Sequence, residues 1–537
     1  MSRPLFLIGL DGASFDVLAP LLAAGELPVL GGLIAGGVSG TLRSVVPPIT
    51  PAAWSSFLTG KRPGRHGIYD FRLYDPRTGE DTFVTSRALR DATLWELLVA
   101  AGRRVAVVNL PMMYPPHPPG ATIVSGFDTP SRDAAFTLPP ELRGRILARH
   151  PDYTFVAVPD AADPNLESDA GFDTFLSRVE RALDQRAAVA ADLLAAGPWD
   201  AFMVHHQDTD ALQHLAWRFI VDGERFPERA ARVRGVYRRL DAQLGELLAR
   251  APREALVVVL SDHGFGAHTG RVFPNVLLRR WGYLSWRGRR RTRLARSVRK
   301  RLAWLGLART VRTSEEAWEV RVRTQGFRDA LPLRWHRTRA YVAVAEIHAL
   351  LYLNVRGRER DGTVDPENVQ ALAEEIRARF LSVRDPVDGE PVFADVLRGH
   401  EIYPEDPFGR RPHLILVPRP GYTVRRELLP SLWLDRYKVA SGTHRPEGIL
   451  IAAGPGVHAG RRIEPAEIVD LAPTLLAAAG LPVPEDMEGR VLTELFVEPP
   501  AVTFAAPTAR TRGDDGALSE TEEGQVMERL RSLGYLA

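Results

Sequence analysis

The most informative absence from this chain of 537 residues is cysteine, of which it has none. Disulfide bonds, zinc sites built from thiolates and cysteine nucleophiles are therefore excluded. The sequence also lacks any apolar stretch of about 18 or more residues, so we expect no transmembrane helix. The apolar run Leu5–Leu10 ends at Asp11 and is too short for the core of a signal peptide. Together these absences predict a cytoplasmic protein.

A strong excess of one charge is also absent. Lys and Arg number 69 and Asp and Glu number 66, so the formal net charge is +3. Such a small value does not by itself indicate nucleic-acid binding. The chain is 45% hydrophobic and 25% charged, which is typical of a globular enzyme. Its length suits one large domain with an elaborate insertion, or two to three domains.

Apolar runs of strand length alternate along the chain with longer helical patterns. Continuous apolar strands that alternate with helices predict an α/β fold with a mostly parallel central sheet, covered by helices on both faces. The expected strands are Leu5–Leu10, Val105–Val108, Ala201–Val204, Ala255–Leu260 and Gly448–Ala452, and the clearest helices are Asp173–Ala196 and Arg229–Arg250.

Acidic and imidazole side chains follow several of these strands. Asp11 follows the first strand, Asp210 follows the strand through Val204, and the pair Asp262 and His263 follows the strand through Leu260. In open α/β sheets, ligands bind at the carboxyl ends of the strands. We therefore expect these side chains to meet at one rim of the sheet.

The composition changes near residue 281 and again near residue 430. We expect residues 1–280 to form the first part of the catalytic core, and residues 431–497 its last part. Residues 281–430 would form an inserted basic segment and an α+β cap that sets specificity. In this cap, residues 341–355 are strand-like and 365–381 are helical. Residues 498–537 are expected to be a linker (498–518) and a short helix, in which Ser519 and Glu522 have the spacing of a capping box.

The start of the inserted segment is strongly basic. Residues 287–312 contain ten Arg and one Lys and no acidic residue. A solvated amphipathic helix is the favoured interpretation, because Leu294, Val298, Leu302 and Leu305 have helical spacing. Binding of an anionic substrate, a phospholipid surface or nucleic acid is the alternative.

Thr50 precedes Pro51 and a helical pattern, which predicts a helix N-terminus. An isolated threonine in this position usually caps the helix. The same position also suits a nucleophile, because the free N–H groups and the positive end of the helix dipole favour a phosphoryl group.

Each of the remaining candidate residues is a weaker indication of a site when it is taken alone. Asp210 and His214 are four residues apart and share a face of a helix, although an isolated pair of this kind is usually surface charge. Asp208 is an alternative ligand to Asp210. His205 or His206 could hydrogen-bond to the ligands without contacting the metal. Asn109 follows another strand, and a buried polar role in its loop is favoured over substrate contact.

Taken in order, the motifs LIGLDG, PPITPAAWSSFLTG, QDTDALQH, VVVLSDHGFG and ASGTHRPEG resemble the alkaline phosphatase superfamily. The resemblance is strongest to its type I phosphodiesterase/nucleotide pyrophosphatase-like branch and to bacterial predicted phosphohydrolase or phosphomutase proteins. It implies that Thr50, nine residues before Thr59, is the nucleophile. It further implies one metal ion on Asp11, Thr50, Asp262 and His263, and a second on Asp210, His214 and His444.

The resemblance implies a metal-dependent phosphohydrolase with a covalent phospho-threonine intermediate. The expected cofactors are two divalent ions, with zinc favoured because it accepts mixed His and carboxylate ligands, and manganese as the alternative. The expected partner is a small phosphate ester, with a phosphodiester or nucleotide pyrophosphate favoured. A sulfatase is disfavoured because its nucleophile usually derives from cysteine. A phosphomutase with the same ligands and a non-catalytic binding protein are the alternatives, and the oligomeric state is left open.

Overall fold

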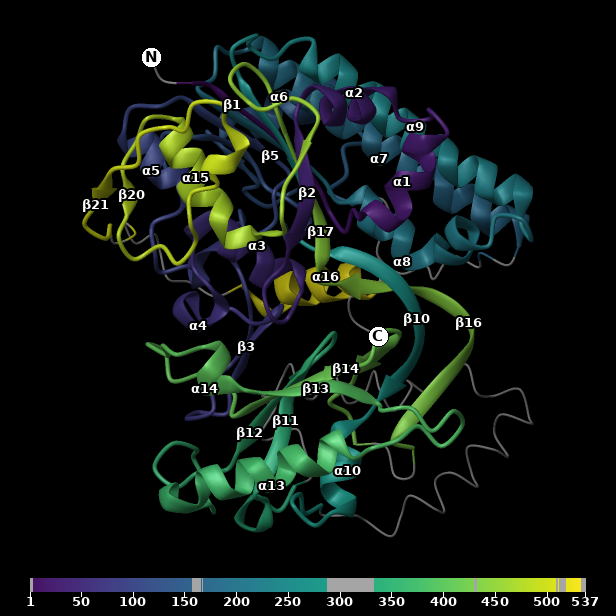
Figure 1. The fold of residues 1–537 in the computed structure, drawn as a ribbon, viewed down its shortest axis with the longest axis vertical. Coiled ribbons are helices and arrows are strands. Elements are labelled where there is room, and N and C mark those ends of the chain that lie inside the picture. Colours follow the sequence, from purple (N-terminus) through teal and green to yellow (C-terminus); the bar gives the residue numbers. More distant parts are fainter. Residues whose placement is uncertain are drawn as a thin grey trace. The chain divides into compact units, whose positions relative to one another are not determined.

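The computed structural model describes residues 3–156, 166, 168–286, 333–428, 432–508, 510 and 518–532 (Figure 1). The chain divides into two compact units. The first comprises Met1–Phe71, Phe83–Thr269 and Tyr437–Ala537, and the second comprises Arg72–Thr82 and Gly270–Arg436. The second unit therefore begins eleven residues before the expected boundary at 281 and also includes the earlier segment 72–82. The Arg-rich stretch 287–312 lies outside the described residues.

A large mixed sheet forms the centre of the first unit. The five middle strands, β9-β1-β8-β5-β6, are mutually parallel, whereas β17 and β7 are antiparallel to their neighbours β9 and β6. In spatial order the strands are β18 (Arg461–Arg462), β2 (Val38–Arg43), β17 (Glu447–Ala453), β9 (Leu256–Leu260), β1 (Leu5–Leu10), β8 (Ala201–His206), β5 (Val105–Val108), β6 (Thr122–Val124) and β7 (Thr137–Leu138), with β19 (Ala466–Glu467) also paired to β2.

The register of the central strands brings their carboxyl ends to one level. Gly9 of β1 lies opposite His205 of β8 and Leu260 of β9. A side chain at Gly9 would meet the ring of His205 at 2.9 Å and that of Trp54 at 3.0 Å. Glycine is therefore required beneath the rim where the three strands end.

Helices cover both faces of this sheet, as Figure 1 shows. One set packs together on one side, and a second set packs together on the other. The expected α/β fold class is thus confirmed. The first set is α1 (Phe15–Ala23), α2 (Pro28–Gly36), α7 (Asp169–Ala195), α8 (Asp208–Val221) and α9 (Pro227–Leu248), and the second is α3 (Thr50–Thr59), α5 (Leu94–Ala100), η5 (Ile468–Asp470) and α15 (Leu471–Ala478).

Helix α7 illustrates why these segments are helical. Its buried residues Phe172, Phe175, Leu176 and Val179 recur at helical spacing and form one apolar face. Burying such side chains stabilises the fold by about 1.5–3 kcal/mol each. The helix starts four residues before the expected Asp173, because the side chain of Ser168 accepts a hydrogen bond from the Gly171 N–H at 3.1 Å and caps it there.

The second unit is built on an antiparallel four-stranded sheet. Residues 341–355, expected to be strand-like, form two strands joined by a turn, β11 (Ala340–Ala345) and β12 (Ala349–Leu353), because β11 and β12 pair antiparallel. The expected helix 365–381 becomes η4 (Pro366–Asn368) followed by α13 (Val369–Leu381). The unit also contains β14 (Leu414–Pro418), β13 (Phe393–Arg398), β15 (Tyr422–Val424), β3 (Arg72–Tyr74), α10 (Pro274–Arg280), α14 (Gly399–Ile402) and η3 (Trp335–Arg337).

Two strands, β10 (Gly264–Val272) and β16 (Leu434–Arg445), begin or end in the first unit and continue into the second. Together with β15 they form a three-stranded sheet. At these two crossings the chain passes from one unit to the other within a strand. The remaining short elements are α4 (Pro63–His66), η1 (Ser86–Ala88), α6 (Glu141–Arg149), η6 (Thr493–Leu495) and β4 (Asp81–Phe83).

The C-terminal region is only in part a linker. Within the expected linker 498–518, β21 (Phe504–Ala505) pairs in parallel with β20 (Val483–Pro484), so this part belongs to a small sheet. The final helix α16 spans Glu520–Ser532. The expected capping box is present: Ser519 Oγ accepts from the Glu522 N–H at 3.3 Å, and Glu522 Oε2 accepts from the Ser519 N–H at 2.9 Å.

Among the described helices, none is individually long and apolar enough to cross a membrane. In the part of the chain that the structure describes, α1 and α2 satisfy that test when taken together, and they are bent by 99° with respect to each other.

Candidate active site

All seven predicted site residues lie in the first unit, and all are buried at the carboxyl ends of the central strands. They come from five separate stretches of chain. Asp11 follows β1, Thr50 opens α3, Asp210 and His214 lie in the first two turns of α8, Asp262 and His263 connect β9 to β10, and His444 lies near the end of β16. Six of them form two groups, each with ligand atoms within 4.8 Å of one another: Asp210, His214 and His444, and Asp11, Asp262 and His263.

The first group is a triangle of electron-pair donors. His214 Nε2 lies 3.0 Å from His444 Nε2. Asp210 Oδ1 lies 3.5 Å from the first nitrogen and 3.4 Å from the second. Two ligands of a tetrahedral zinc ion, each about 2.1 Å from the metal, are about 3.4 Å apart. The spacing of the three atoms therefore suits one small cation between them.

Backbone carbonyls fix the orientation of both imidazoles in this group. His214 Nδ1 lies 3.2 Å from the Gly442 carbonyl oxygen, and His444 Nδ1 lies 3.1 Å from the Pro48 carbonyl oxygen. A carbonyl only accepts, so each Nδ1 carries the proton and each Nε2 presents a lone pair. The two Nε2 atoms are 3.0 Å apart, so their lone pairs repel each other. A cation between the two nitrogens removes that repulsion.

The second group has the same construction. His263 Nε2 lies 3.5 Å from Asp11 Oδ1 and 3.4 Å from Asp262 Oδ2. Its Nδ1 lies 3.1 Å from the Gly264 carbonyl oxygen, so this Nε2 also presents a lone pair. The groups adjoin, because His263 Nε2 is 4.0 Å from Asp210 Oδ1. They coincide with the two ligand sets that the family resemblance implies, while the metal-binding role itself stays a prediction.

Each of the three carboxylates uses one oxygen for the protein and presents the other to its group. Asp11 Oδ2 lies 2.9 Å from His205 Nε2, Asp262 Oδ1 accepts from the Gly12 N–H at 3.3 Å, and Asp210 Oδ2 accepts from Gln207 Nε2 at 3.4 Å. The other oxygens, Asp11 Oδ1, Asp262 Oδ2 and Asp210 Oδ1, are buried and accept no hydrogen bond from the described residues. Buried, uncompensated carboxylate oxygens are costly, and bound cations remove the cost.

The electrostatics of the groups agree with this geometry. Burial raises the pKa of Asp11 well above its ordinary value, and the charges of Asp262 and Asp210 raise it further. Burial also raises the pKa of Asp262, with Asp210 adding to the effect. Divalent ions would relieve the repulsion among the acids.

Thr50 stands beside the second group. Its Oγ1 lies 3.4 Å from His263 Nε2. Our expectation that Thr50 is the N-cap is wrong by one residue: the extended Ile49 is the N-cap and Thr50 is the first helical residue. Pro51 fits the next position because N–H groups of the first turn have no partner within the helix. The hydroxyl therefore lies at the positive end of a ten-residue helix that is buried along its whole length.

Several supporting residues were missed or left undecided by the sequence analysis. His205 contacts Asp11, whereas neither ring nitrogen of His206 has a hydrogen-bond partner among the described residues. Trp54 Nε1 also donates to Asp11 Oδ2, at 3.4 Å. Its spacing of four residues from Thr50 places it on the same helix face, a signal that could have been used.

The rival ligand Asp208 is engaged elsewhere. It forms a buried ion pair with Arg186 of α7 and belongs to neither group of ligands. Asn109 is also buried and takes a left-handed conformation (φ 63°) at the end of β5. Its Oδ1 accepts a hydrogen bond from the Tyr153 hydroxyl at 2.6 Å, which agrees with the favoured role in its loop.

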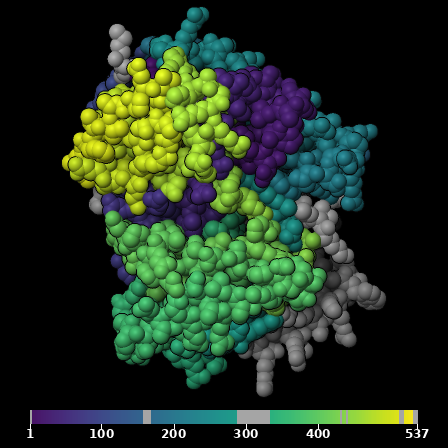
Figure 2. Space-filling view, viewed as in Figure 1, coloured from purple at the N-terminus to yellow at the C-terminus, as the bar shows by residue number. Residues whose placement is uncertain are grey.

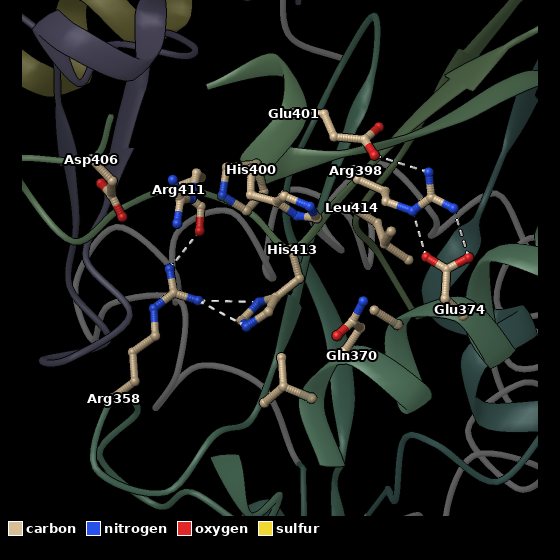
Figure 3. Close-up of a pocket in the computed structure, with 13 residues that line it drawn as sticks. Arg358, Gln370, Glu374, Arg398, His400, Glu401, Asp406, Arg411, His413 and Leu414 are labelled. Carbon is tan, nitrogen blue, oxygen red and sulfur yellow. Dashed lines mark hydrogen bonds and ion pairs between the residues drawn. The ribbon is translucent and has the colours of Figure 1, made fainter. Parts of the chain in front are cut away.

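A separate cavity of about 670 Å³ lies within the second unit, and Figure 3 shows its lining. None of the seven site residues lines it. Its charged groups are partnered: Arg398 Nε lies 2.6 Å from Glu374 Oε1, its Nη1 lies 3.1 Å from Glu401 Oε1, and Arg358 Nη1 lies 3.1 Å from His413 Nδ1. This cavity therefore lacks the uncompensated groups that mark the site in the first unit.

The model of the type I phosphodiesterase/nucleotide pyrophosphatase family matches residues 5–446, and the chain belongs to this family. The family match defines the class: a hydrolase of the alkaline phosphatase superfamily that acts on phosphoric ester bonds.

Among solved structures, the chain is similar to phosphonoacetate hydrolase from Sinorhizobium meliloti 1021, solved in complex with phosphonoformate. The identity is 18%, the TM-score is 0.55, and the match covers 89% of this chain and 96% of that one. This likeness supports the fold. No curated protein matches the chain.

Proposed function

We propose that the chain is a two-metal phosphohydrolase with Thr50 as its nucleophile. The observation that supports this most is the convergence of three unpartnered carboxylate oxygens and three imidazole nitrogens in two adjoining groups, with the Thr50 hydroxyl 3.4 Å from one of those nitrogens. Asp210, His214 and His444 would hold one ion, and Asp11, Thr50, Asp262 and His263 the other. Both sets suit zinc, with manganese as the alternative. When bound, such ions neutralise phosphate charge and activate oxygen nucleophiles.

The chain's own groups suit an in-line displacement. The Thr50 hydroxyl loses its proton and its oxygen attacks phosphorus. An Oγ–P bond forms while the bond from phosphorus to the departing oxygen breaks, and the departing oxygen takes up a proton. The N-terminus of α3 favours the negative charge of the phosphoryl group. Water then hydrolyses the phospho-threonine, which releases phosphate or a phosphate monoester and restores the hydroxyl. Two successive displacements replace one difficult step by two easier ones.

The family favours a phosphodiester or a nucleotide pyrophosphate as substrate. Phosphate monoesters and, because the structural neighbour is a phosphonoacetate hydrolase, phosphonoacetate are the comparison substrates. The expected partner is thus a small phosphorus compound, and the cytoplasmic location stays a prediction.

The test is a panel of phosphate monoesters, diesters, pyrophosphate esters and phosphonoacetate, assayed with zinc and with manganese. Wild type is expected to turn over at least one of them. Thr50→Ala removes the nucleophile and should lower kcat by at least about a hundredfold. Thr50→Ser keeps a hydroxyl and is the matched control, which should retain most of the activity. A Thr50→Ala variant as active as wild type would contradict the proposal.

Product analysis distinguishes the alternatives. Phosphate release identifies a hydrolase, whereas isomerisation of a sugar phosphate without release identifies a phosphomutase. A metal-loaded wild type that turns over none of the panel would favour the non-catalytic binding protein.

A further inference from the structure

The two predicted metal groups are carried by separate segments of the first unit. Helix α8 supplies Asp210 and His214 to one group, whereas Asp11, directly after β1, belongs to the other. Two-metal sites hold their ions about 3.5–4 Å apart, so α8 must keep a fixed position relative to the end of β1. Side-chain hydrogen bonds from α8 to the backbone after β1 provide that connection.

Helix α8 and the segment after β1 are neighbours. Figure 1 shows α8 near α1, which follows Asp11 closely in the chain, and in Figure 2 the surface of the N-terminal segment (purple) adjoins that of the α9 region (teal). The groups that join the two segments are buried, because Thr209 is 4% exposed and Gln213 is 1% exposed. Both lie on α8, four residues apart and therefore on one face, next to Asp210 and His214 in the chain.

Thr209 binds the backbone of a predicted metal ligand. Its hydroxyl lies 2.6 Å from the Asp11 carbonyl oxygen and 3.2 Å from the His206 carbonyl oxygen. A hydroxyl has one proton, and the shorter contact receives it. The His206 oxygen also accepts from the Asp11 N–H at 3.0 Å, which extends the pairing of β1 and β8 by one residue. Thr209 therefore fixes the peptide group between Asp11 and Gly12.

Gln213 binds the next residue of the same turn. Its side-chain nitrogen donates to the Gly12 carbonyl oxygen at 2.9 Å and to the Thr209 carbonyl oxygen at 3.0 Å. Both acceptors are carbonyls, so the nitrogen must face them and both of its protons are used. The amide oxygen Oε1 is buried and has no hydrogen-bond partner among the described residues. Because an unsatisfied buried acceptor offsets much of the gain from the two donated bonds, this amide contributes to geometry more than to stability.

Gly12 continues the connection to the second group. Its carbonyl accepts from Gln213, and its N–H donates to Asp262 Oδ1 at 3.3 Å. Gly12 has a left-handed backbone conformation (φ 67°), and a Cβ atom there would meet the Phe265 ring at 2.8 Å and Asp210 Oδ1 at 3.3 Å. Glycine is therefore needed where α8 meets the ligands of the second group.

The backbone of Gln213 contacts a third segment that carries a ligand. A Cβ atom at Gly442 would meet the Gln213 carbonyl oxygen at 2.2 Å, so β16 packs directly against this turn of α8. The Gly442 carbonyl oxygen lies 3.2 Å from His214 Nδ1, and His444 follows two residues later. One turn of α8 thus joins the segments that carry the first group to the turn that carries Asp11.

We propose that Thr209 and Gln213 are positioning residues that set the separation of the two bound cations by tying α8 to the backbone of Asp11 and Gly12. Neither side chain ligates an ion. Without these hydrogen bonds every ligand remains, but α8 can shift relative to the end of β1, so the ions bind more weakly and at a changed separation. The inference rests on the two-metal site proposed above.

The test uses the full chain and two readouts other than activity. Equilibrium dialysis with manganese and with zinc measures the affinity for each ion, and electron paramagnetic resonance of the manganese form measures the exchange coupling between the ions. This coupling falls steeply with the separation of the two ions, so it reports the geometry of the pair. Wild type is expected to bind two ions per chain and to give the spectrum of a coupled pair.

Two substitutions remove the hydrogen bonds and keep the packing. Gln213→Met preserves the length of the side chain, and Thr209→Val preserves its shape. Each should weaken binding of at least one ion by about 10–100-fold, the usual cost of losing a group that orients a ligand, and should change the coupling at saturating manganese. Thr209→Ser retains the hydroxyl and should keep the wild-type affinity and spectrum.

Gln185→Met is the matched control. Gln185 lies on α7, and its Nε2 donates to the Asp152 carbonyl oxygen at 2.8 Å. It therefore also ties a helix to a loop, but neither residue belongs to the two ligand groups. This variant should bind both ions like wild type and give the same coupled spectrum. Circular dichroism establishes that each variant is folded, and if one of the two test variants does not fold, the other decides.

The outcomes separate this inference from the two-metal proposal. Wild type that binds fewer than two ions per chain with either metal would overturn both. If wild type binds two ions, an affinity or a coupling that a folded Thr209→Val or Gln213→Met variant leaves unchanged would overturn the inference alone. A loss in Gln185→Met equal to that in Gln213→Met would also overturn it, because any broken bond between a helix and a loop would then disturb the site.

Discussion

Two clusters of ionisable side chains in this molecule differ in whether each charged group faces a group of opposite charge. In the cavity of the second unit, Arg398 lies against Glu374 and Glu401, so opposite charges face each other. At the strand ends of the first unit, carboxylates and neutral imidazoles face one another, and all of them offer electron pairs. A count of charged residues would rank the two clusters alike. Only the sign and protonation of the facing atoms show which one suits cations.

The sharpest test of this comparison removes one histidine from each cluster. His444→Ala deletes a nitrogen from the first group, and we expect loss of one bound ion and a fall in kcat/KM on the order of a thousandfold. His400→Ala, from the exposed lining of the second cavity, should change kcat/KM by less than about twofold. Metal content by atomic emission and steady-state kinetics provide the measurements. Equal effects of the two substitutions would mean that the two clusters do not differ in metal binding or catalysis.

A smaller effect is expected from a residue that touches a ligand but is not one. His205 holds Asp11 through a 2.9 Å contact between Nε2 and Oδ2. His205→Ala should lower metal affinity by about 10–100-fold, the usual cost of losing a group that orients a ligand. Competition with a chelator measures the affinity. Because the ligand set stays complete, saturating metal should restore most of kcat, and a kcat that stays low at saturation would show that His205 does more than orient Asp11.

An isolated buried acid should behave differently from the clustered acids. Asp128 is buried, its Oδ1 has no hydrogen-bond partner among the described residues, and burial raises its pKa to about 7. Its unfolded value is about 3.9. Between about pH 4 and 7 the folded state therefore binds the extra proton, so this acid makes stability fall as pH rises through that window and level off above it.

Asp128→Asn should abolish that dependence, because the amide cannot ionise but can still accept from the Tyr114 N–H. We expect the variant to be more stable than wild type by roughly 1–3 kcal/mol at pH 8 and by much less at pH 5. Urea denaturation at the two pH values measures the difference. The same difference at both values would mean that Asp128 does not titrate in this range.

The smallest effect, on thermal stability, should come from a substitution in the ion-paired cluster of the second unit. Arg398 and its partners are partly exposed, and screened ion pairs contribute little to stability. Arg398→Gln should shift Tm by less than about 3 °C. A thermal melt of the metal-loaded protein, compared with wild type at low and high salt, checks this. A much larger shift in Tm would mean that the ion pairs of Arg398 contribute more to stability than their exposure suggests.

Much of the first unit follows from local pattern. The strands at 5–10 and 105–108 form within the predicted limits, because continuous apolar runs of this length suit a sheet buried on both faces. The limits of helices were less accurate. The N-cap of α3 is the extended residue Ile49 and not Thr50. The N-cap of α7 is Ser168, so this helix begins about one turn earlier than predicted. Both errors arise because a boundary is set by one backbone dihedral or one side-chain hydrogen bond, which periodicity does not encode.

The second unit was less predictable for a related reason. The segment 72–82 belongs with residues 270–436, although nearly 190 residues separate the two stretches, and no composition change marks it. The apolar stretch 341–355 turns back on itself as an antiparallel pair. Its register depends on cross-strand contacts, so the run alone could not distinguish one strand from two.

The sequence by itself determined the inventory of this protein: no thiol, an alternating α/β pattern, and a set of acids, imidazoles and one threonine in family order. Tertiary structure alone decided which oxygens and nitrogens face one another, and that Asp208 is held by Arg186 rather than by the ligand groups. The physical reason is that a residue's chemistry is local, whereas its protonation, orientation and compensation depend on neighbours that come from distant parts of the chain.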